Sequence, residues 1–297
     1  MTESLEYRYA VVTGANKGIG FEICKQLASN GVKVVLTSRD EKRGLDALEN
    51  FKGTNLNDLV IFHQLDVVDP ASVASLAQFV KNQFGKLDIL VNNAGINGVL
   101  MDEEAFRASR EANGLQTGLQ TMFIESNESV VQCLQTNYYG AKRMVEHFLP
   151  LLELSDSPRI VNVSSSMGKL KDLKNKMANG ILCDVENLTE EKIDKVFNVY
   201  LNDFKDGMLE TKRWPTTLSS YIISKAALNG YTRILAKKYT ILFVNCVCPG
   251  FVKTDINYNT GILSVEEGAE TPVKIALSLH NGPSGCFFDR NGVTSFE

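Results

Sequence analysis

The sequence predicts an α/β fold, a doubly wound parallel sheet of about seven strands with helices on both faces. Short, continuously apolar runs, typical of strands buried on both faces, alternate with longer stretches of helical periodicity. A glycine-rich turn directly follows the first apolar run and precedes the first helical stretch. Because no internal repeat or interdomain linker interrupts this alternation, we expect residues 1–297 to form one domain.

Local signals mark where the helices begin and end. Asn30-Gly31 ends the first helix, since these residues tolerate the conformation that terminates helices. Asp69-Pro70 begins the third, with aspartate as N-cap and proline at the first helical position. The expected strands are Tyr9–Thr13, Lys33–Thr37, Leu59–Gln64, Leu87–Asn92, Arg159–Ser164, Ile241–Val247 and, at the edge, Gly285–Asp289. The expected helices cover Phe21–Ser29, Glu41–Phe51, Pro70–Phe84, Ser129–Leu152 and Thr217–Lys238.

Two segments are too long to be ordinary connections, which normally have about 2 to 6 residues. Residues 97–127 lie between the fourth strand and its helix, and residues 167–216 between the fifth strand and the next helix. In the second segment, apolar side chains repeat at the spacing of one helix face: Ile193, Val196, Phe197, Tyr200, Leu201 and Phe204. We therefore expect residues 167–216 to contain a folded helical flap.

The composition excludes several classes of function. With 31 basic and 35 acidic side chains and no lysine- and arginine-dominated stretch, the chain is not expected to bind nucleic acid. It has no signal peptide pattern and no run near the about 18 apolar residues of a membrane span, so no membrane association is expected. Its six cysteines and three histidines lack the spacing of metal ligands. We expect reduced cysteines, no metal and a cytoplasmic location.

The turn after the first strand predicts a nucleotide site. It reads Thr13-Gly14-Ala15-Asn16-Lys17-Gly18-Ile19-Gly20. The glycines allow a tight turn and close backbone approach to a pyrophosphate, and the following helix offers free N–H groups and the positive end of its dipole. A glycine-rich turn alone is weak evidence, but the strand before it and the helix after it strengthen the prediction. The spacing argues against kinases and ATPases, whose phosphate loops differ.

The end of the second strand indicates which nucleotide is bound. Folds that prefer NAD place an acidic residue there for the ribose 2′-hydroxyl, but this chain has Ser38-Arg39. Arg39, together with Lys17, would attract a 2′-phosphate, so NADP is predicted. The alternative is two solvated basic side chains. Asp66, just after the third strand, is placed to meet the adenine or, alternatively, to cap a turn or helix.

Tyr221 and Lys225 are four residues apart on a predicted helix and share one of its faces. A nearby ammonium group should lower the pKa of the phenol, which could then exchange a proton with a carbonyl or alcohol oxygen near neutral pH. Such a pair is common on helix surfaces, and alone it says little. Ser164-Ser165-Ser166 and Asn92-Asn93, however, follow two central strands at the edge where ligands bind in doubly wound folds. The sequence therefore predicts one crevice holding all these groups.

These features occur together, and in order, in a known family. The turn at 13–20, Asn92-Asn93-Ala94-Gly95, Asn137, Ser165 before Gly168, Tyr221 with Lys225, and Pro249-Gly250 resemble the classical short-chain dehydrogenases/reductases over nearly the whole chain. The 56 residues from Ser165 to Tyr221 (221 − 165) resemble the carbonyl-reductase branch. Stretches such as FGKLDILVNNAG and VNCVCPGFVKTDINY are similar to the plant salutaridine reductase and menthone:neomenthol reductase branch.

The resemblance implies a role for each matching residue. Tyr221 would be the catalytic acid/base, Lys225 would lower its pKa and bind the nicotinamide ribose, and Ser165 would polarise the carbonyl. Asn137, by itself an ordinary helix residue, would link Lys225 to solvent through a water molecule. The residues expected to bind NADPH/NADP+ are Thr13, Gly14, Asn16, Lys17, Gly18, Ile19, Gly20, Ser38, Arg39, Asp66, Val67, Asn92, Ala94, Gly95, Tyr221, Lys225, Pro249, Gly250, Val252 and Thr254. Those expected to contact substrate are Val99, Met101, Asp102, Ser165, Leu170, Phe251, Ile256 and Asn257.

The expected function is NADPH-dependent reduction of a bulky apolar ketone, salutaridine-like or menthone-like, to a secondary alcohol, because the segments flanking the crevice are largely apolar. The alternative is a broad-specificity carbonyl reductase for aldehydes, ketones and quinones. Relatives that reduce C=C bonds have an acidic residue in place of the tyrosine, so Tyr221 argues against that reaction. Cofactor sensing without catalysis is disfavoured by the intact set of four catalytic residues. Since the flap of this branch covers the helices through which other members form tetramers, we expect a monomer.

Overall fold

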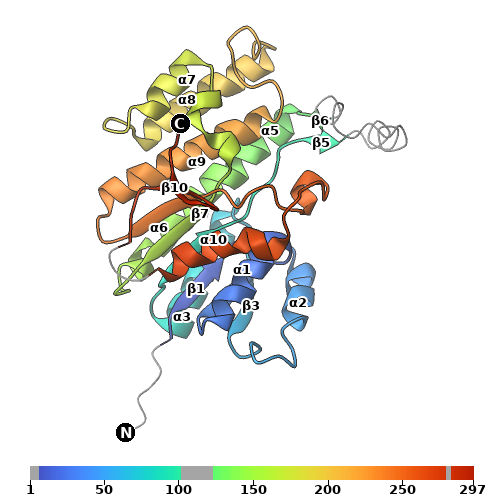
Figure 1. Ribbon diagram of the computed structural model, residues 1–297, viewed down its shortest axis with the longest axis vertical. Helices are drawn as coiled ribbons and strands as arrows, with labels where there is room; N and C mark the ends of the chain where they lie inside the picture. The colour runs from blue at the N-terminus through green and yellow to red at the C-terminus, as the bar shows by residue number, and fades with distance from the viewer. Residues whose placement is uncertain (1–6, 102–122, 279–281) are drawn as a thin grey trace.

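Eight strands form one sheet in the computed structural model, which describes residues 7–101, 123–278 and 282–297 (Figure 1). The order across the sheet is β10-β9-β8-β7-β4-β1-β2-β3, and all neighbours are parallel except β9 and β10. The predicted doubly wound parallel sheet is therefore confirmed. The strands are β1 Tyr9–Val12, β2 Lys33–Ser38, β3 Val60–Gln64, β4 Ile89–Asn92, β7 Arg159–Val163, β8 Phe243–Val247, β9 Phe287–Asp289 and β10 Gly292–Thr294.

The sheet has one strand more than the sequence predicts, and several strands begin or end one or two residues from their expected bounds. The additional strand, β10, has three residues and pairs antiparallel with β9. The amide of Asn291 donates to the Asp289 carboxylate in the turn between them. Three residues carry too little periodicity to be distinguished from a loop in the sequence.

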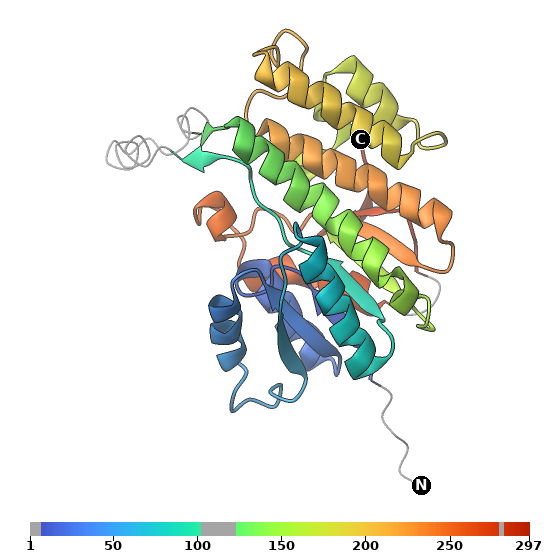
Figure 2. The same ribbon diagram turned by 180° about the vertical axis from the view of Figure 1, so that it is seen from behind.

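Helices cover both faces because strand residues point alternately to either side. Val11 and Leu90 belong to the core on one side of the sheet, and Ala10 and Ile89 to the core on the other. Figures 1 and 2 show the two helical layers from opposite sides. The first core includes α3 (Pro70–Phe84), α5 (Asn127–Leu134), α6 (Ala141–Leu152) and α9 (Ser219–Lys238); the second includes α1 (Gly18–Ser29), α2 (Glu41–Glu49) and α10 (Val265–Leu277).

The predicted helix signals act as expected. The Asp69 carboxylate accepts a hydrogen bond of 2.9 Å from the Ala71 amide, and Pro70 occupies the first turn of α3. At the end of α1, Gly31 has a φ of +78°, and its amide donates to the carbonyl of Ala28. These local contacts fix the direction in which the chain enters and leaves the helices.

One predicted helix is interrupted. The sequence suggests a single helix over Ser129–Leu152, but α5 and α6 are joined by a six-residue π-helical stretch, Gln135–Gly140. The widened turn shifts the side chains that follow it around the helix axis. Such π-helical insertions are often found at functional sites.

Both long segments contain regular structure. Residues 167–216 include the predicted helix, α8 (Glu190–Lys205), together with α7 (Lys176–Cys183), which lie together above α9 (Figure 1). Ile193, Val196, Phe197 and Tyr200 are buried in the first core. In the other segment, β5 (Leu100–Met101) pairs antiparallel with β6 (Phe123–Ile124).

Within the described ranges, no helix is both long and apolar enough to cross a membrane. The same residues contain no group of three histidine, cysteine, aspartate or glutamate side chains arranged to hold a metal ion. All six cysteines are free thiols, and Cys24, Cys133, Cys246 and Cys248 are buried.

Candidate active site

The glycine turn is held in shape by the end of the neighbouring strand β4. The Thr13 hydroxyl accepts hydrogen bonds of 2.9 Å from the amides of Asn93 and Ala94. The Asn93 side chain donates in return to the carbonyls of Thr13 and Gly14. These hydrogen bonds fix the turn against the end of β4.

Two glycines in this turn are required by close contacts. Gly14 has a φ of +63°, and a Cβ there would lie 2.9 Å from Cα of Ala94. A Cβ on Gly20 would lie 2.4 Å from Nδ2 of Asn93 and 2.6 Å from the carbonyl oxygen of Gly14. Only hydrogen atoms fit between the turn, the first turn of α1 and β4. The backbone amides at the start of α1 can thus approach a phosphate group closely.

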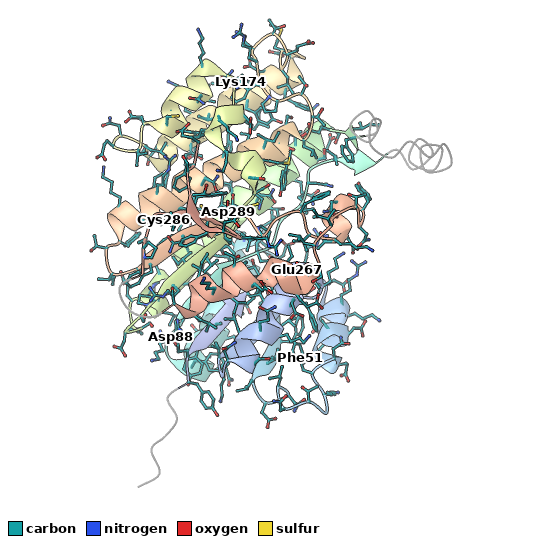
Figure 3. The ribbon with its side chains drawn as sticks, in the orientation of Figure 1. Phe51, Asp88, Lys174, Glu267, Cys286 and Asp289 are labelled. Atoms are coloured by element: carbon teal, nitrogen blue, oxygen red, sulfur yellow. The ribbon has the colours of Figure 1, made fainter. Side chains whose placement is uncertain are left out.

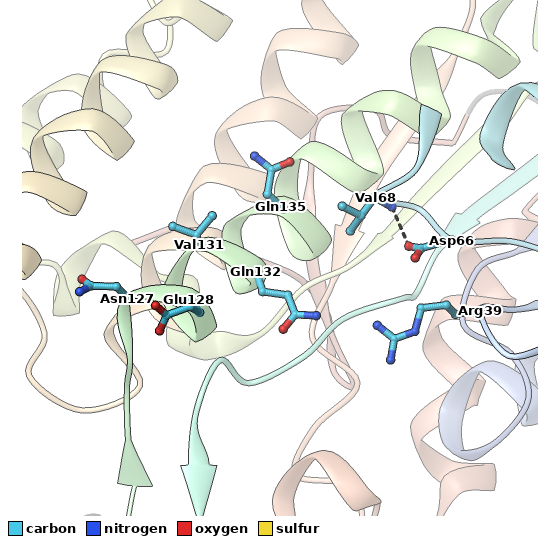
Figure 4. A pocket seen from close by; sticks show the side chains of 8 residues that line it. All are labelled: Arg39, Asp66, Val68, Asn127, Glu128, Val131, Gln132 and Gln135. Atoms are coloured by element: carbon cyan, nitrogen blue, oxygen red, sulfur yellow. Dashed lines mark hydrogen bonds between the residues drawn. The ribbon is translucent and has the colours of Figure 1, made fainter. Parts of the chain in front are cut away.

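An open pocket of about 650 Å³ lies beside the end of β2 (Figure 4). The Arg39 guanidinium provides its positive charge, and the Asp66 carboxylate lies near it. One oxygen of Asp66 accepts a 2.9 Å hydrogen bond from the Val68 amide, which is the turn-capping role considered as an alternative for this residue. The pocket is lined by Arg39, Asp66, Val68, Asn127, Glu128, Val131, Gln132 and Gln135.

Lys17 is not among the residues that line this pocket with Arg39. Its ammonium group pairs instead with the Asp255 carboxylate at 2.5 Å, and both side chains are exposed. The pairing lowers the pKa of Asp255 below its ordinary value, through the hydrogen bond and charge of Lys17. The segment after β8 reaches the turn at a second point, since a Cβ on Gly18 would lie 3.5 Å from Cγ2 of Thr254.

Several other residues predicted to bind the cofactor have buried side chains. The amide of Asn92 donates to Asn162 on β7 at 2.9 Å, and the side chain of Val252 packs on Gly268 of α10. Ser38 and Val67 are also buried. These residues could contact a cofactor only through backbone atoms or a small exposed part of their surface.

The three serines after β7 have different surroundings. Ser164 is buried, and its hydroxyl donates to the side-chain oxygen of Asn229 at 2.6 Å. Ser166 is exposed and belongs to a short 3-10 turn, Ser166–Gly168. The Ser165 hydroxyl accepts from the Met167 amide at 3.2 Å, and it lies close enough to the Tyr221 phenol to lower the pKa of that phenol. Ser165 is therefore the serine of the three that reaches the tyrosine.

Tyr221 and Lys225 lie one turn apart on α9, with the lysine Nζ 5.6 Å from the centre of the phenol ring. Lys225 is 4% exposed, and its ammonium group donates to the Val163 carbonyl at 2.8 Å. A Cβ on Gly168 would lie 2.7 Å from the backbone carbon of Lys225, so glycine is needed for the serine turn to meet α9. The predicted pair is thus assembled with Ser165.

The expected pKa of Tyr221 is wrong in direction. Burial raises its pKa to about 12, and this effect outweighs the hydrogen bond from Ser165, which lowers it. Burial also lowers the pKa of Lys225 to about 8. The charge of the lysine alone would lower the pKa of the phenol, whereas desolvation in the folded chain penalises both the phenolate and the ammonium. Near neutral pH the phenol holds its proton.

Asn137 lies within the π-helical stretch and is buried. Its side-chain oxygen accepts from the amide of Ile96, and its amide donates to the Ile96 carbonyl, both at 2.9 Å. A Cβ on Gly95 would lie 3.3 Å from the Asn137 oxygen and 3.5 Å from Nζ of Lys225. The backbone at Gly95 therefore lies beside both side chains, and these two predicted residues lie near each other.

The predicted substrate contacts are only partly brought together. Phe251 and Ile256 are 51% and 38% exposed after β8, but Leu170 is buried in the first core, which is a correction. Asn257 is half-buried, and its side chain hydrogen-bonds to the backbone of Thr254 and Val252 within its own loop. Val99 is largely buried, Met101 belongs to β5, and Asp102 lies outside the described residues.

Comparison with known proteins identifies the family. The model of the short chain dehydrogenase family matches residues 8–178, more than half of the chain. The chain belongs to this family. The resemblance inferred from the sequence motifs is thereby confirmed.

The relatives of this short-chain dehydrogenase include plant enzymes. It is 61% identical to (+)-neomenthol dehydrogenase of Arabidopsis thaliana, over 97% of this chain and 98% of the relative. The structure of salutaridine reductase from Papaver somniferum superimposes with a TM-score of 0.90, at 52% identity, covering 95% of this chain and 99% of the other. Menthone neomenthol reductase from Mentha piperita superimposes with a TM-score of 0.84, at 50% identity, covering 96% and 99%.

Two contributions to the site are not predicted by the sequence. Asn93 was expected only to line the crevice, but it connects β4 to the glycine turn. Gln132 and Gln135 line the Arg39 pocket from α5 and its π-helical continuation, more than 90 residues along the chain from Arg39. No local pattern marks either role, because each depends on which elements become neighbours.

Proposed function

We propose that this short-chain dehydrogenase reduces a bulky apolar ketone, such as a salutaridine-like alkaloid or a menthone-like monoterpenoid, to a secondary alcohol with NADPH. The proposal rests on one arrangement: Ser165, Tyr221, Lys225 and Asn137 meet beside the glycine turn, at the carboxyl ends of β1, β4 and β7. Ligands of doubly wound folds bind at this edge. The names of the plant relatives, which include reductases and dehydrogenases of such compounds, support the substrate class.

The residues of the chain fit NADPH. The glycine turn and the start of α1 would hold the pyrophosphate, because the turn leaves room for close backbone approach. Arg39 would hold the 2′-phosphate, since its guanidinium is an exposed cation in the pocket beside β2. When bound, NADPH supplies the hydride that the ketone carbon accepts.

The chain supplies the proton and orients the ketone. The Tyr221 phenol, which holds its proton near neutral pH, gives it to the carbonyl oxygen as the C=O π bond breaks and a C–H bond forms. The Ser165 hydroxyl would donate a hydrogen bond to the same oxygen and so favour the developing negative charge. The Lys225 ammonium places a positive charge one helical turn from the phenol, where it stabilises the phenolate left behind.

Exposed apolar side chains near these residues favour a large apolar substrate. Met167 lies two residues after Ser165 and is exposed, and Phe251 and Ile256 are exposed after β8. Such surfaces bind ligands mainly by burial of apolar area, with few polar contacts. The same exposed apolar side chains would also accept smaller carbonyl compounds. The second candidate function is therefore a carbonyl reductase of broad specificity for aldehydes, ketones and quinones. In either case we propose a monomer located in the cytoplasm.

The test is NADPH oxidation by the purified protein with menthone, salutaridine, simple aldehydes and a quinone. Rapid turnover of one bulky ketone, with little turnover of the others, would support the proposed function. Similar low rates with all compounds would favour the broad carbonyl reductase. No NADPH oxidation with any carbonyl compound, by a protein that binds NADPH, would refute both.

A further inference from the structure

The helix that carries Tyr221 and Lys225 lacks an N-cap of its own. Leu218, which precedes α9, has the left-handed backbone conformation and provides no side-chain acceptor. The first amides of a helix have no partner within the helix, so they need acceptors from elsewhere. Because Tyr221 is the third residue of α9, the position of this first turn also sets the position of the phenol.

Glu125 supplies the missing acceptors from a distant part of the chain. One carboxylate oxygen accepts from the amide and hydroxyl of Ser219, at 2.9 and 2.8 Å. The other accepts from the amide and hydroxyl of Ser220, at 2.9 and 2.7 Å. The negative charge also lies at the positive end of the helix dipole, where it is favourable. Both oxygens are thus bonded to the residues directly before Tyr221.

The same contact extends toward Asn137. The Ser220 hydroxyl also lies against the buried thiol of Cys133, and Asn137 donates to that sulfur at 3.4 Å and to the Ser224 hydroxyl at 3.0 Å. The segment before β5 also packs against Ser220, since a Cβ on Gly98 would lie 2.4 Å from the Ser220 hydroxyl oxygen. The Glu125 carboxylate is therefore connected, through Ser220 and Cys133, to Asn137, another member of the proposed catalytic set.

We propose that Glu125 is a positioning residue for the reaction: it holds the first turn of α9 so that Tyr221 stays aligned with Ser165 and the ketone. This inference rests on the proposed function, because it assumes that Tyr221 is the proton donor. It also assigns a purpose to the position of Glu125 directly after β6, because its hydrogen bonds join the end of β6 to the start of the catalytic helix.

The experiment compares Glu125→Gln with Glu267→Gln. Gln keeps the shape of Glu125 but turns an N–H toward one of the two backbone amides, which then loses its acceptor. Glu267 (Figure 3) is the control, because its carboxylate also accepts from a backbone amide at the start of a helix, that of Ser264 before α10, which carries no proposed catalytic residue. Its other oxygen pairs with Arg290 at 3.2 Å, so this variant also weakens one exposed ion pair. Ser220→Ala removes one donor to the same carboxylate and gives a second, independent perturbation.

For each variant, kcat and KM are measured with the panel compound that the wild type turns over fastest, together with NADPH affinity by fluorescence and the thermal midpoint. Displacement of the phenol predicts that kcat of Glu125→Gln falls by about 10- to 100-fold, with KM and NADPH affinity changed less than about threefold. Ser220→Ala should lower kcat less, and the double variant should lose less than the product of both effects. Glu267→Gln should keep its kcat.

An unchanged kcat in Glu125→Gln, with a thermal midpoint lowered as in the control, would overturn the inference. Glu125 would then only stabilise the start of α9 and would not position Tyr221. A raised KM with unchanged kcat would also overturn it, since Glu125 would then act through substrate contacts. Tyr221→Phe is measured in parallel. If that variant retains wild-type activity, the proposed function fails, whereas an inactive Tyr221→Phe beside a fully active Glu125→Gln refutes the positioning role alone.

Discussion

Replacing Lys225 by methionine is expected to separate stability from activity. Lys225 is 4% exposed, and burial lowers its pKa from 10.5 to about 8. Between these values the unfolded chain binds more protons than the folded chain, so the free energy of unfolding of the wild type rises with pH. Below about pH 8, burying the ammonium opposes folding by about 3 kcal/mol, from the size of the shift.

The expected pH dependence can be worked out from these pKa values. Relative to Lys225→Met, the wild type should gain about 2 kcal/mol of unfolding free energy between about pH 7 and about pH 9.5. The other titrating groups are present in both proteins, so their contributions to the pH dependence of the unfolding free energy cancel in the difference. At about pH 7 the variant also leaves the Val163 carbonyl without its 2.8 Å donor, which costs about 1 to 3 kcal/mol. The variant should therefore be at least as stable as the wild type at about pH 7, but inactive.

Urea unfolding of the cofactor-free proteins, followed by fluorescence, measures this difference. The chain has a single tryptophan, Trp214, which is 3% exposed in the folded state and should report its unfolding. Cofactor must be absent, because a ligand that binds the folded state shifts the apparent stability. If the difference in unfolding free energy between wild type and variant is the same at both pH values, the ammonium is not desolvated in the folded protein and the reasoning is refuted.

Four further outcomes are expected. Tyr221→Phe should lower kcat by about 10²- to 10⁴-fold without changing NADPH affinity, because it removes only the proton donor; wild-type kcat would eliminate the assigned role. Arg39→Glu should weaken NADPH binding by about 10- to 100-fold and shift the preference toward NADH; an unchanged ratio of the two affinities would place the 2′-phosphate elsewhere. Gly20→Ala should raise KM for NADPH and lower stability by about 1 to 3 kcal/mol, since its Cβ would lie 2.4 Å from Asn93; wild-type values for both would show that the turn can relax. Light scattering should give a mass near the 32.8 kDa of one chain, and the mass of a tetramer would contradict the monomer.

Local pattern was enough for much of the fold. Most strands and helices follow from short-range periodicity, which reflects whether one or both faces of an element are buried. The Tyr221 and Lys225 pair could be predicted because a helix places residues four apart on one face, whatever it packs against. The glycine turn at 14–20 could be predicted because tight backbone approach requires glycine at fixed spacing.

The serine choice shows where pattern and structure had to be combined. The resemblance to the family selects Ser165 by its spacing to Gly168, whereas the structure shows that the hydroxyl of Ser164 is already bonded to Asn229. The layout of the family places Leu170 and Asn257 beside the crevice, but Leu170 is buried. Their side chains are used by the core and by their own loop, respectively. The residues adjacent to them in the sequence do not indicate these packing and hydrogen-bond contacts.

By itself, then, the sequence determined the doubly wound sheet, seven of its strands and most of the helices between them, and it named residues that could carry out the chemistry. It did not predict α7, α10 or β10. Tertiary structure decided the contacts between residues far apart in the chain: the four hydrogen bonds from α9 to Glu125 and the ties of Asn137 to Ile96. It also decided the direction of the pKa shift of Tyr221. The physical reason is that periodicity depends on near neighbours along the chain, whereas desolvation and capping depend on atoms that only folding brings together.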